Sequence, residues 1–452
     1  MITPAQELFY EGNRLMQSGK LLVAEQCFRN AIKIDPEFSE AWANLGHLRS
    51  KVGDLGFAEQ CYLKAIAFSP DLEPPYLMLG VLLMNQKRFM ESEHLYRNYL
   101  EAHPTSPGGW SNLGVLLASL KRETEAERCY RTALRIDENY AKASFNLSYI
   151  LLRQQRWEEG WRCLEDRWQY PLLEKHFICP RWRGESLYGK ALIIGFEMGH
   201  GDMIFYARYV GELKARGVKK LAMTVHPGLK KLFATLAGVD QIYSLDDEVP
   251  AQGWDYWLPP MSLPHFCQTR SNNIPAPIPY LHADPALTEL WKSRLPANGL
   301  NVGLVWRGNP LFENDADRSI PSLNEFAALA DMPEVNFIGM QKGQGENDVH
   351  PLGMAFQAMG SLLNDFADTA ALIQNLDLVI SVDTAVAHLA GAMGKTCWVL
   401  LPDFRCDWRW QSEWADTAWY PEKMRLFRQS AGGGWESVIS NVRDELVYLL
   451  FH

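Results

Sequence analysis

The pattern of apolar and polar positions is most informative near the end of the chain, in Asp377–Leu401. It opens with a short apolar run, as in a strand that is covered on both faces. Ala385–Met393 is rich in small residues and predicts a helix, with Asp383 or Thr384 as its N-cap. Thr396–Leu401 predicts a second buried strand. The stretch therefore predicts a strand–helix–strand unit with parallel strands and a right-handed crossover.

Apolar runs alternate with amphipathic segments over the rest of the second half. The other predicted strands are Lys190–Phe196, Lys220–Val225, Gln241–Leu245, Asp255–Leu258, Asn301–Trp306, Asn336–Met340 and Met424–Phe427. The other predicted helices are Met203–Arg216, Pro227–Ala237, Ser322–Ala330, Thr369–Gln374 and Trp435–Leu450, the last of which could pack back on the first lobe. This alternation predicts two α/β lobes with parallel sheets and a cleft between the carboxyl ends of their strands.

The first third of the chain has a longer period, because the same residue types recur every 34 positions. The series are Gly12, Gly46, Gly80 and Gly114; Ala24, Ala58, Ser92 and Ala126; Phe28, Tyr62, Tyr96 and Tyr130; Pro36, Pro70 and Pro104; and Trp42 and Trp110. They resemble the tetratricopeptide repeat (TPR), which has two antiparallel helices per unit. Four repeats and a degenerate fifth extend from about Thr3 to Trp168, and the proline is expected to end the second helix of each unit.

Asn44, Asn112 and Asn146 share one phase of the repeat, with Met78 in the slot between the first two. The phase resembles the asparagine ladder of the repeat domain in O-GlcNAc transferases, which holds the backbone of an extended polypeptide. An asparagine amide both donates and accepts, which suits a peptide backbone of any sequence. The alternative is that these are ordinary solvated positions of helices.

Three tryptophans, at 157, 161 and 168, crowd the end of the repeats and predict a packed junction. We therefore expect a TPR superhelix at 1–168, a junction at 169–186, one α/β lobe at 187–298 and a second at 299–452. The resulting fold class is α followed by α/β.

The composition excludes several classes of protein. The 452 residues carry a formal net charge of −10, which argues against a nucleic-acid binder that neutralises phosphates. Four of the eight cysteines share one phase of the repeat, as core residues would, and no Cys/His cluster has metal-binding spacing. Because no secretory signal or long apolar run is present, we expect a soluble cytoplasmic protein.

Asp202 and His200 stand in a glycine-containing turn after the first predicted strand of the second half. A carboxylate at a strand end can accept the proton of an acceptor hydroxyl, which makes Asp202 a candidate base. His200 is a second candidate, although a single histidine in a turn is usually incidental. Asp202 can equally be the N-cap of the helix predicted from Met203.

Other polar residues follow predicted strands of the second lobe, where cations and free backbone N–H groups can bind a nucleotide diphosphate. These candidates are Arg307, Asn309, Arg318, Lys342, Asp383, Thr384, Ala385 and His388. Each basic residue alone is more often a surface charge, and His388 could simply pack under the sheet. Of Asp365 and Asp368, one is expected to cap a helix and the other to reach a ribose or base. No acidic motif of a metal-dependent transferase stands at a strand end, so no metal is expected.

These residues together resemble glycosyltransferases of family 9, the heptosyltransferase-like enzymes. With the repeats in front, the chain is similar to bacterial TPR glycosyltransferases, some of which are linked to flagellin modification. The matching motifs are GD (Gly201–Asp202), GLVWRGNP (Gly303–Pro310), RSIP (Arg318–Pro321), QKG (Gln341–Gly343), DFADTAALI (Asp365–Ile373) and SVDTAVAHLAGA (Ser381–Ala392).

The resemblance implies a GT-B fold of two Rossmann-like lobes and inverting, metal-independent transfer, with a nucleotide-sugar as co-substrate and no other cofactor. It implies that Asp202 is the base, that Thr384, Ala385 and His388 contact the nucleotide diphosphate, and that Lys342 binds phosphate. The turn here reads EMGHGD where the related pattern is EQGLGD, which leaves the part of His200 open.

The acceptor of heptosyltransferases is a lipid sugar, whereas the repeats favour a polypeptide acceptor, with flagellin as one candidate. Two alternatives stay open. The protein could be a TPR scaffold with an inactive transferase-like region, or an enzyme that acts on a lipid-linked glycan.

Overall fold

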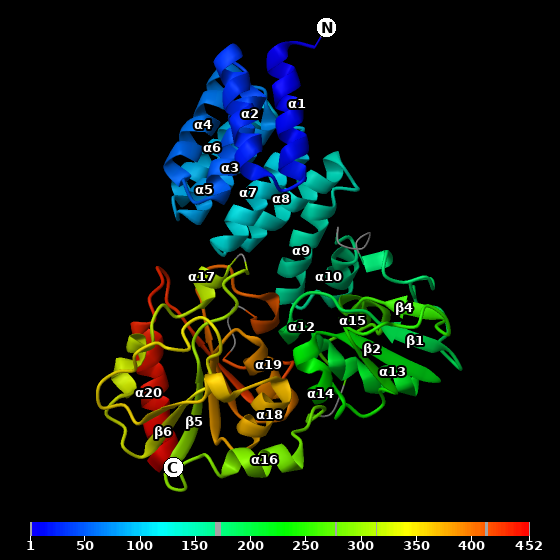
Figure 1. The fold of residues 1–452 in the computed structure, drawn as a ribbon, viewed down its shortest axis with the longest axis vertical. Coiled ribbons are helices and arrows are strands. Elements are labelled where there is room, and N and C mark those ends of the chain that lie inside the picture. Colours follow the sequence, from blue (N-terminus) through cyan, green and yellow to red (C-terminus); the bar gives the residue numbers. More distant parts are fainter. Residues whose placement is uncertain (1, 168–172, 276–277, 313, 412–414, 452) are drawn as a thin grey trace. The chain divides into compact units, whose positions relative to one another are not determined.

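The computed structural model describes residues 2–167, 173–275, 278–312, 314–411 and 415–451. The chain divides into two compact units, of which the first ends at Leu147 and the second begins at Ser148. The first unit consists of helices, and the second contains two β-sheets (Figure 1). Trp168 lies outside the described residues. In the described ranges, every helix is too short or too polar to cross a bilayer.

The helices of the first unit follow one another in pairs, two in each 34-residue repeat, as predicted. They are α1 (Pro4–Gln17), α2 (Leu21–Ile34), α3 (Ser39–Lys51), α4 (Leu55–Phe68), α5 (Glu73–Asn85), α6 (Phe89–Ala102), α7 (Pro107–Ser119) and α8 (Glu123–Ile136). The division between the units falls within α9 (Ala141–Arg153), and α10 (Trp157–Leu164) belongs to the second unit.

The glycine and aromatic series of the repeat meet inside each helix pair. A methyl group added at Gly12 would lie 2.6 Å from the ring of Phe28, and one at Gly46 would lie 2.7 Å from the ring of Tyr62. The other two such pairs are Gly80 with Tyr96 and Gly114 with Tyr130. Each glycine therefore makes room for a buried ring, which explains why the two series keep the same period.

The proline and tryptophan series also form one contact. Pro36 and Pro104 each stand two residues beyond the end of the second helix of a repeat. Trp42 and Trp110, in the next helices, donate their indole N–H groups to the carbonyls of these prolines at 2.8 and 2.9 Å. The turn between repeats is thus held to the helix that follows it.

The first sheet of the second unit has the strand order β3-β2-β1-β4, with parallel pairs throughout. Its strands are β1 (Ala191–Ile194), β2 (Lys220–Val225), β3 (Gln241–Ser244) and β4 (Tyr256–Leu258). Its helices are α12 (His200–Tyr206), α13 (Val210–Ala215), α14 (Lys230–Phe233) and α15 (Leu263–Phe266), with the 3₁₀ helices η1 (Ala207–Tyr209), η2 (Pro227–Leu229) and η3 (Pro260–Ser262). We call this sheet and its helices the first lobe.

The second sheet has the order β10-β9-β8-β5-β6-β7, again with parallel pairs. Its strands are β5 (Leu300–Val305), β6 (Val335–Gly339), β7 (Phe356–Ala358), β8 (Leu378–Val382), β9 (Cys397–Leu401) and β10 (Met424–Arg428). Its helices are α16 (Pro285–Lys292), α17 (Asp315–Arg318), α18 (Phe366–Gln374), α19 (Ala385–Ala392) and α20 (Glu436–Phe451), with the 3₁₀ helices η4 (Leu323–Leu329), η5 (Gly360–Leu362) and η6 (Trp408–Trp410). We call this sheet and its helices the second lobe.

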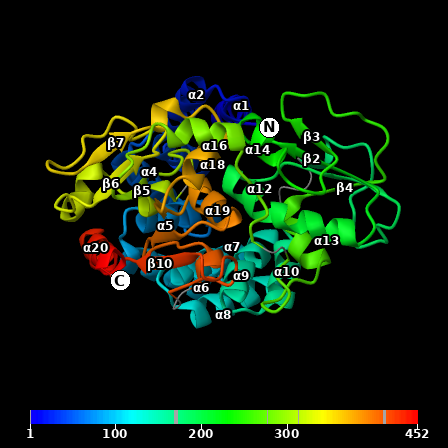
Figure 2. The same ribbon diagram turned by 90° about the horizontal axis from the view of Figure 1, so that it is seen from below.

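The predicted strand–helix–strand unit is confirmed, since β8, α19 and β9 follow one another and the two strands pair in parallel. β7 and α16 were not predicted, and the helix predicted at Ser322–Ala330 is a 3₁₀ helix. α16 lies beside α18 in the second lobe (Figure 2).

The last helix, α20, covers the second sheet. Val438, Ile439, Val442 and Leu446 of this helix are completely buried and share one core with Trp398 of β9 and Phe427 of β10. The expectation that this helix could pack back on the first lobe is wrong, because its apolar stripe is buried on the sheet whose last strand directly precedes it.

The expected packed junction is confirmed for the two tryptophans of α10. The rings of Trp157 and Trp419 are 5.5 Å apart, and those of Trp161 and Trp408 are 5.2 Å apart. The Trp161 indole also donates to the carbonyl of Thr269 at 2.9 Å. The end of the degenerate fifth repeat is therefore part of the α/β unit.

Candidate functional site

The order of the second sheet contains a reversal between β5 and β8. From β5 the chain winds outward through β6 and β7, and it then returns to β8 and winds the other way through β9 and β10. In open parallel sheets, ligands bind outside the carboxyl ends of the strands at such a reversal. Val305, the last residue of β5, pairs with Ser381 of β8. The residues that follow these two strands, Arg307 and Asp383 among them, therefore lie at the edge that the topology favours.

α19 begins at this edge, and Thr384 is its N-cap. The Thr384 hydroxyl accepts a hydrogen bond from the N–H of Val386 at 3.2 Å, and it lies 2.9 Å from the hydroxyl of Ser381. The sequence left Asp383 and Thr384 as alternative caps, and the structure selects Thr384. Ala385 is then the first residue of the helix, and the backbone N–H groups of the first turn have no partner within the helix.

The start of α19 stands directly against α12 of the first lobe. A methyl group added at Gly201 would lie 3.1 Å from the ring of His388 and 3.4 Å from the Cα atom of Ala385. A larger side chain at position 201 would therefore be crowded between the two helices. The GD turn and the SVDTAVAHLAGA motif, which are far apart in the sequence, meet here.

Asp202, the third residue of α12, has both carboxylate oxygens engaged. Oδ2 accepts the N–H of Gly199 at 3.0 Å, and Oδ1 accepts from Nη2 of Arg409 at 2.6 Å. Gly199 is the N-cap of the helix, so the alternative in which Asp202 caps a helix from Met203 is wrong. The side chain of Asp202 is 21% exposed. Its role as a base stays a prediction.

Arg409, which follows β9 in the second lobe, is a partner of Asp202 that sequence reasoning missed. Its guanidinium donates to Asp202 at 2.6 Å and to Asp407 at 3.1 Å, and its side chain is only 8% exposed. Burial alone would lower its pKa, but Asp407 and Asp202 hold that pKa well above its ordinary value. The guanidinium carbon also stands 4.6–5.7 Å from the ring centroids of Phe205, Tyr206 and Trp408.

His388 is buried beside this pair. Its Nδ1 lies 3.1 Å from the hydroxyl of Tyr420, and its ring stacks on that of Trp410 at 5.2 Å. Burial, together with the charge of Arg409, holds the pKa of the imidazole well below its ordinary value. The surroundings of His388 therefore favour the neutral imidazole.

Asp383 is a carboxyl group with a raised pKa. Burial and the neighbouring charge of Asp407 raise the pKa of Asp383 to about 6, against the opposing effects of Arg318, the Trp410 indole and Arg409. A group with this pKa exchanges its proton close to neutral pH. Perturbed groups of this kind, here Asp383 and His388, are typical of functional sites.

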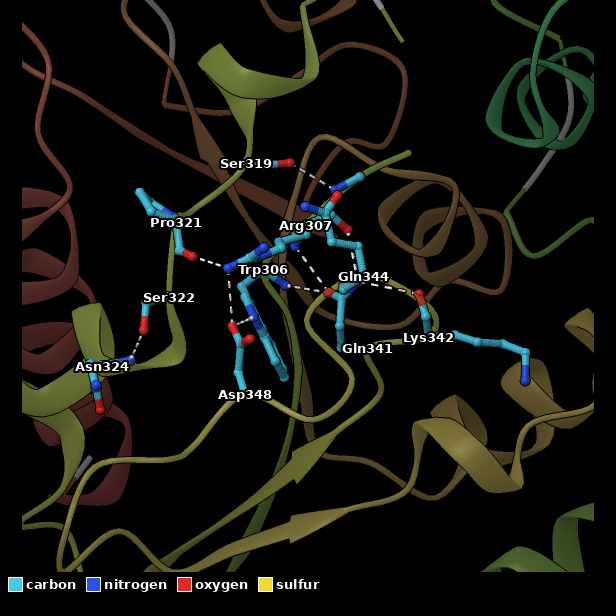
Figure 3. Close-up of polar contacts among 11 residues, drawn as sticks. Trp306, Arg307, Ser319, Pro321, Ser322, Asn324, Gln341, Lys342, Gln344 and Asp348 are labelled. Carbon is cyan, nitrogen blue, oxygen red and sulfur yellow. Dashed lines mark hydrogen bonds and ion pairs between the residues drawn. The ribbon is translucent and has the colours of Figure 1, made fainter. Parts of the chain in front are cut away.

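Arg307 is held by groups of the protein itself (Figure 3). The side-chain oxygen of Gln341 accepts the N–H groups of Trp306 and Arg307 at 3.1 and 3.0 Å. Asp348 accepts the Trp306 indole at 3.1 Å and the Arg307 guanidinium at 3.3 Å, and Arg307 also donates to the carbonyl of Pro321. The QKG glutamine thus ties the ends of β5 and β6 together.

The other predicted phosphate-binding residues do not all converge. Lys342 points away from the Arg307 cluster in Figure 3 and donates to the carbonyl of Leu363 at 2.5 Å. Asn309 is exposed and accepts the N–H of Leu311 at 3.0 Å. Arg318 pairs with Asp315 at 3.2 Å, and its charge also acts on Asp383 and His388.

One of the two aspartates before α18 caps the helix, as expected. Asp365 accepts the N–H groups of Ala367 and Asp368 at 2.9 and 3.2 Å, and it pairs with Lys231 at 2.8 Å. Asp368 is buried, and it accepts from Trp291 at 3.1 Å and from Asn364 at 2.8 and 2.9 Å. Burial opposes ionisation of Asp368, but these hydrogen bonds lower its pKa.

His200, the first residue of α12, packs against His226 of the first lobe with ring centroids 4.2 Å apart, and against Phe366 of α18 at 5.3 Å. Burial and His226 lower the pKa of His200 to about 4. His200 is therefore a weak base in this form of the protein.

In the first unit, the three asparagines of the shared phase lie on α3, α7 and α9, and all three are half-buried. The Asn44 amide donates to the side-chain oxygen of Asn13 at 2.6 Å, and that of Asn112 donates to the hydroxyl of Tyr96 at 3.4 Å. They occupy corresponding places in three of four consecutive repeats, and Met78 of α5 takes the remaining place.

A cavity of about 570 Å³ lies elsewhere in the second unit, at the start of α10. Apart from Trp157 of the junction, its lining contains none of the residues named above. The residues that line it are Gln155, Arg156, Trp157, Glu158, Glu159, Arg162, His265 and Arg270.

Comparisons with known proteins identify tetratricopeptide repeats in the first unit. Residues 39–72 and 77–141 match the tetratricopeptide-repeat family. Among solved structures, the chain is similar to MamA, with 15% identity and a TM-score of 0.30 over 34% of this chain and 91% of that one. It is also similar to PilF of Pseudomonas aeruginosa, with 20% identity and a TM-score of 0.33 over 36% and 74% of the respective chains.

The chain is also similar to Protein FlbA of Caulobacter vibrioides, with 27% identity over 296 residues. The match covers 59% of this chain and 48% of FlbA, so the chain spans about half the length of that relative. The fold and the comparisons together show an N-terminal array of tetratricopeptide repeats followed by an α/β region with two parallel sheets.

Proposed function

We propose that this protein is a glycosyltransferase that moves a sugar from a nucleotide-sugar to a hydroxyl group of a polypeptide held by the TPR array. The observation that carries the proposal is the meeting of α12 and α19. The turn with Asp202 stands against the helix start that follows β8, at the reversal of strand order where nucleotides bind in doubly wound sheets. The motifs that meet there are those that resemble family 9 glycosyltransferases, and two α/β lobes with parallel sheets support the proposal because a GT-B fold requires them.

In the proposed reaction, Asp202 removes the proton of the acceptor hydroxyl. The deprotonated oxygen attacks the anomeric carbon of the sugar. The bond between that carbon and the diphosphate breaks, its electron pair stays on the leaving oxygen, and the configuration of the anomeric carbon is inverted. The start of α19 stabilises the charge that develops on the diphosphate. Arg307 and Lys342 join it only after Arg307 has left Asp348 and Lys342 has left the carbonyl of Leu363. Polypeptide acceptors fit the repeats in front, and flagellin is one candidate.

Asp202→Asn tests the chemistry. The amide oxygen can still accept the N–H of Gly199, so α12 should keep its start, but the group can no longer take a proton. We expect transfer to fall by about a hundredfold or more, measured by intact-mass analysis of acceptor protein incubated with a nucleotide-sugar. Circular dichroism checks that the variant is folded. Near-normal transfer by the folded variant would show that Asp202 is not the base.

A second candidate function is a TPR scaffold whose α/β unit no longer transfers sugar. The observation that favours it is the ion pair between Asp202 and Arg409, because a carboxylate bound to a guanidinium is less available to accept a proton. A scaffold would bind its partner protein without consuming any nucleotide-sugar. Mass analysis of proteins from cells with and without the gene distinguishes the two functions, because a transferase leaves a sugar on its acceptor.

Replacement of Asn44, Asn112 and Asn146 by alanine separates the acceptor classes. A transferase of polypeptides and a scaffold should both lose their protein partner in this triple variant. An enzyme that acts on a lipid-linked glycan should keep its activity, because its acceptor would not use the repeats.

A further inference from the structure

The ion pair of Arg409 joins two parts of the chain that are 207 positions apart. Asp202 comes from the first turn of α12 in the first lobe, whereas Arg409 and Asp407 come from the segment after β9 in the second lobe. Asp407 also accepts the backbone N–H of Arg409 at 2.9 Å. Asp407 is therefore a fixed partner on the same segment, and Asp202 is a partner that the other lobe supplies.

In the part of the chain that the structure describes, one N–H donor of the Arg409 guanidinium has no acceptor. Arginine has five N–H groups, and within the described ranges the Nε atom of Arg409 is buried without an acceptor. The side-chain amide of Gln411, two residues on, is 3% exposed and has no hydrogen-bond partner among the described residues either. Buried donors of this kind are costly unless an acceptor is supplied. An anionic ligand supplies several.

The same segment borders the start of α19. Trp410 stacks on His388 at 5.2 Å, and the charge of Arg409 acts on both His388 and Asp383. The helix start that we propose to hold the diphosphate thus lies close to the guanidinium. A planar guanidinium binds phosphate oxygens in pairs, as it binds a carboxylate.

We propose that Arg409 is a diphosphate-binding residue of this site, and that Asp202 occupies it in the ligand-free protein. Diphosphate binding and release of the Asp202 carboxylate are then a single exchange. Arg409 keeps Asp407, gives up Asp202 and donates to the phosphate oxygens instead. This inference rests on the proposed function, to which it adds a regulatory step, because the base becomes available only when a donor is bound.

Calorimetric titration of the full chain with inorganic pyrophosphate tests the exchange. In Asp202→Asn, the anion no longer competes with a carboxylate for Arg409, so pyrophosphate should bind about fivefold or more tightly than to the wild type. Asp407→Asn is the matched control. Like Asp202→Asn, it removes one negative charge beside the Arg409 guanidinium, but it leaves the ion pair with Asp202 in place. The asparagine side chain can still accept the backbone N–H of Arg409. This variant should change the affinity by about twofold at most.

Arg409→Lys should weaken pyrophosphate binding by about tenfold, because an ammonium cannot replace the bidentate guanidinium. If this variant does not fold, the comparison of Asp202→Asn with Asp407→Asn decides alone. Unchanged or weaker binding by Asp202→Asn, equal tightening by Asp407→Asn, or no binding by any variant would overturn the exchange.

The two proposals fail in different ways. If no nucleotide-sugar is consumed but Asp202→Asn binds pyrophosphate more tightly, the exchange stands and the enzymatic function falls. If Asp202→Asn abolishes transfer without changing pyrophosphate affinity, Asp202 is the base and the exchange is wrong.

Discussion

The two units of the chain use their contacts in opposite ways. In the helical unit one contact is copied, because the glycine of each repeat faces the aromatic ring of the same repeat. In the α/β unit the important contacts occur once and join distant residues, as Asp202 and Arg409 do. A copied local contact leaves a period in the sequence, whereas a single long-range contact leaves none. The difference explains which half of the molecule can be interpreted from sequence alone.

The surface ion pairs of the repeats follow the same rule of copying. Glu59 accepts from Arg88 at 2.6 Å, and one repeat further Glu93 accepts from Arg122 at 2.7 Å. Each arginine also pairs with a glutamate three residues on, at 2.7 Å in both cases. Predictions that contrast copied and single contacts can break or sharpen this comparison.

The largest effect is expected at a single buried pair of the α/β unit. Arg167 and Glu197 are 2.6 Å apart, with side chains 2% and 1% exposed, and Arg167 also donates to the hydroxyl of Ser262 at 2.9 Å. Glu197→Ala leaves a buried cation without this carboxylate. It should lower the free energy of unfolding by about 3–5 kcal/mol, measured by urea unfolding with tryptophan fluorescence.

Lys190→Ala is the control, because the side chains of the Lys190–Asp255 pair in the same lobe are 42% and 39% exposed. Its loss should be much smaller than that of Glu197→Ala. Equal losses would mean that burial does not decide the worth of these pairs.

A repeat glycine gives the next largest effect. Gly80→Ala places a methyl group against the ring of Tyr96, so it should lower the free energy of unfolding by about 1–3 kcal/mol. Gly56→Ala in α4 is the matched control, since nothing lies within 4 Å of that position and alanine favours a helix. The measurement is thermal unfolding followed at a helical circular-dichroism band. If both variants behaved alike, the shared glycine–ring contact would not explain the period.

The site histidines should make the protein sensitive to acid. Burial lowers the pKa of His388 well below 6.5 and, with His226, lowers that of His200 to about 4. The unfolded chain therefore takes up protons near pH 6.5, whereas the folded protein does so only at lower pH. The free energy of unfolding is therefore highest above pH 6.5. It falls as the pH decreases towards the pKa values that the two histidines have in the folded protein. The loss should be about 1 kcal/mol for each histidine between pH 6.5 and 5.5.

Urea unfolding across this range measures the loss, and His388→Gln should reduce it by the share of one histidine. His47 of α3 is the counterpart in the helical unit, because burial and Lys51 lower its pKa too. His47→Gln should have an effect in the same direction, and a smaller one. An unchanged pH profile for His388→Gln would show that this imidazole is protonated as easily in the folded protein as in the unfolded chain.

The smallest effect is expected at a copied surface pair. Arg88→Ala removes the bonds to Glu59 and Glu91, but the side chains are partly exposed and solvent screens their charges. We expect a smaller change in melting temperature than for Gly80→Ala, and it should shrink further as salt is added. A large, salt-insensitive change would show that the copied pairs hold neighbouring repeats together.

The helical pairs and most strands of the α/β unit could be predicted, because the 34-residue period and the apolar runs are local signals. The start of α12 was placed three residues late, because Gly199 caps the helix without a polar side chain. β7 was missed because it is short and largely exposed. In the candidate site, the helix start at Thr384 was predictable from its capping residue. The partner of Asp202 was not, because only the strand order brings Arg409 to it.

The placement of Trp161 has a practical consequence for building chimeras. This tryptophan is fully buried by residues of the α/β unit, although it belongs to the last degenerate repeat. If a foreign repeat domain were joined at residue 168, the α/β region would lose Trp161 and with it part of its hydrophobic core. A chimera that keeps residues 148–167 with the α/β region would retain that core. We therefore expect a foreign repeat domain to be tolerated when it is joined before residue 148.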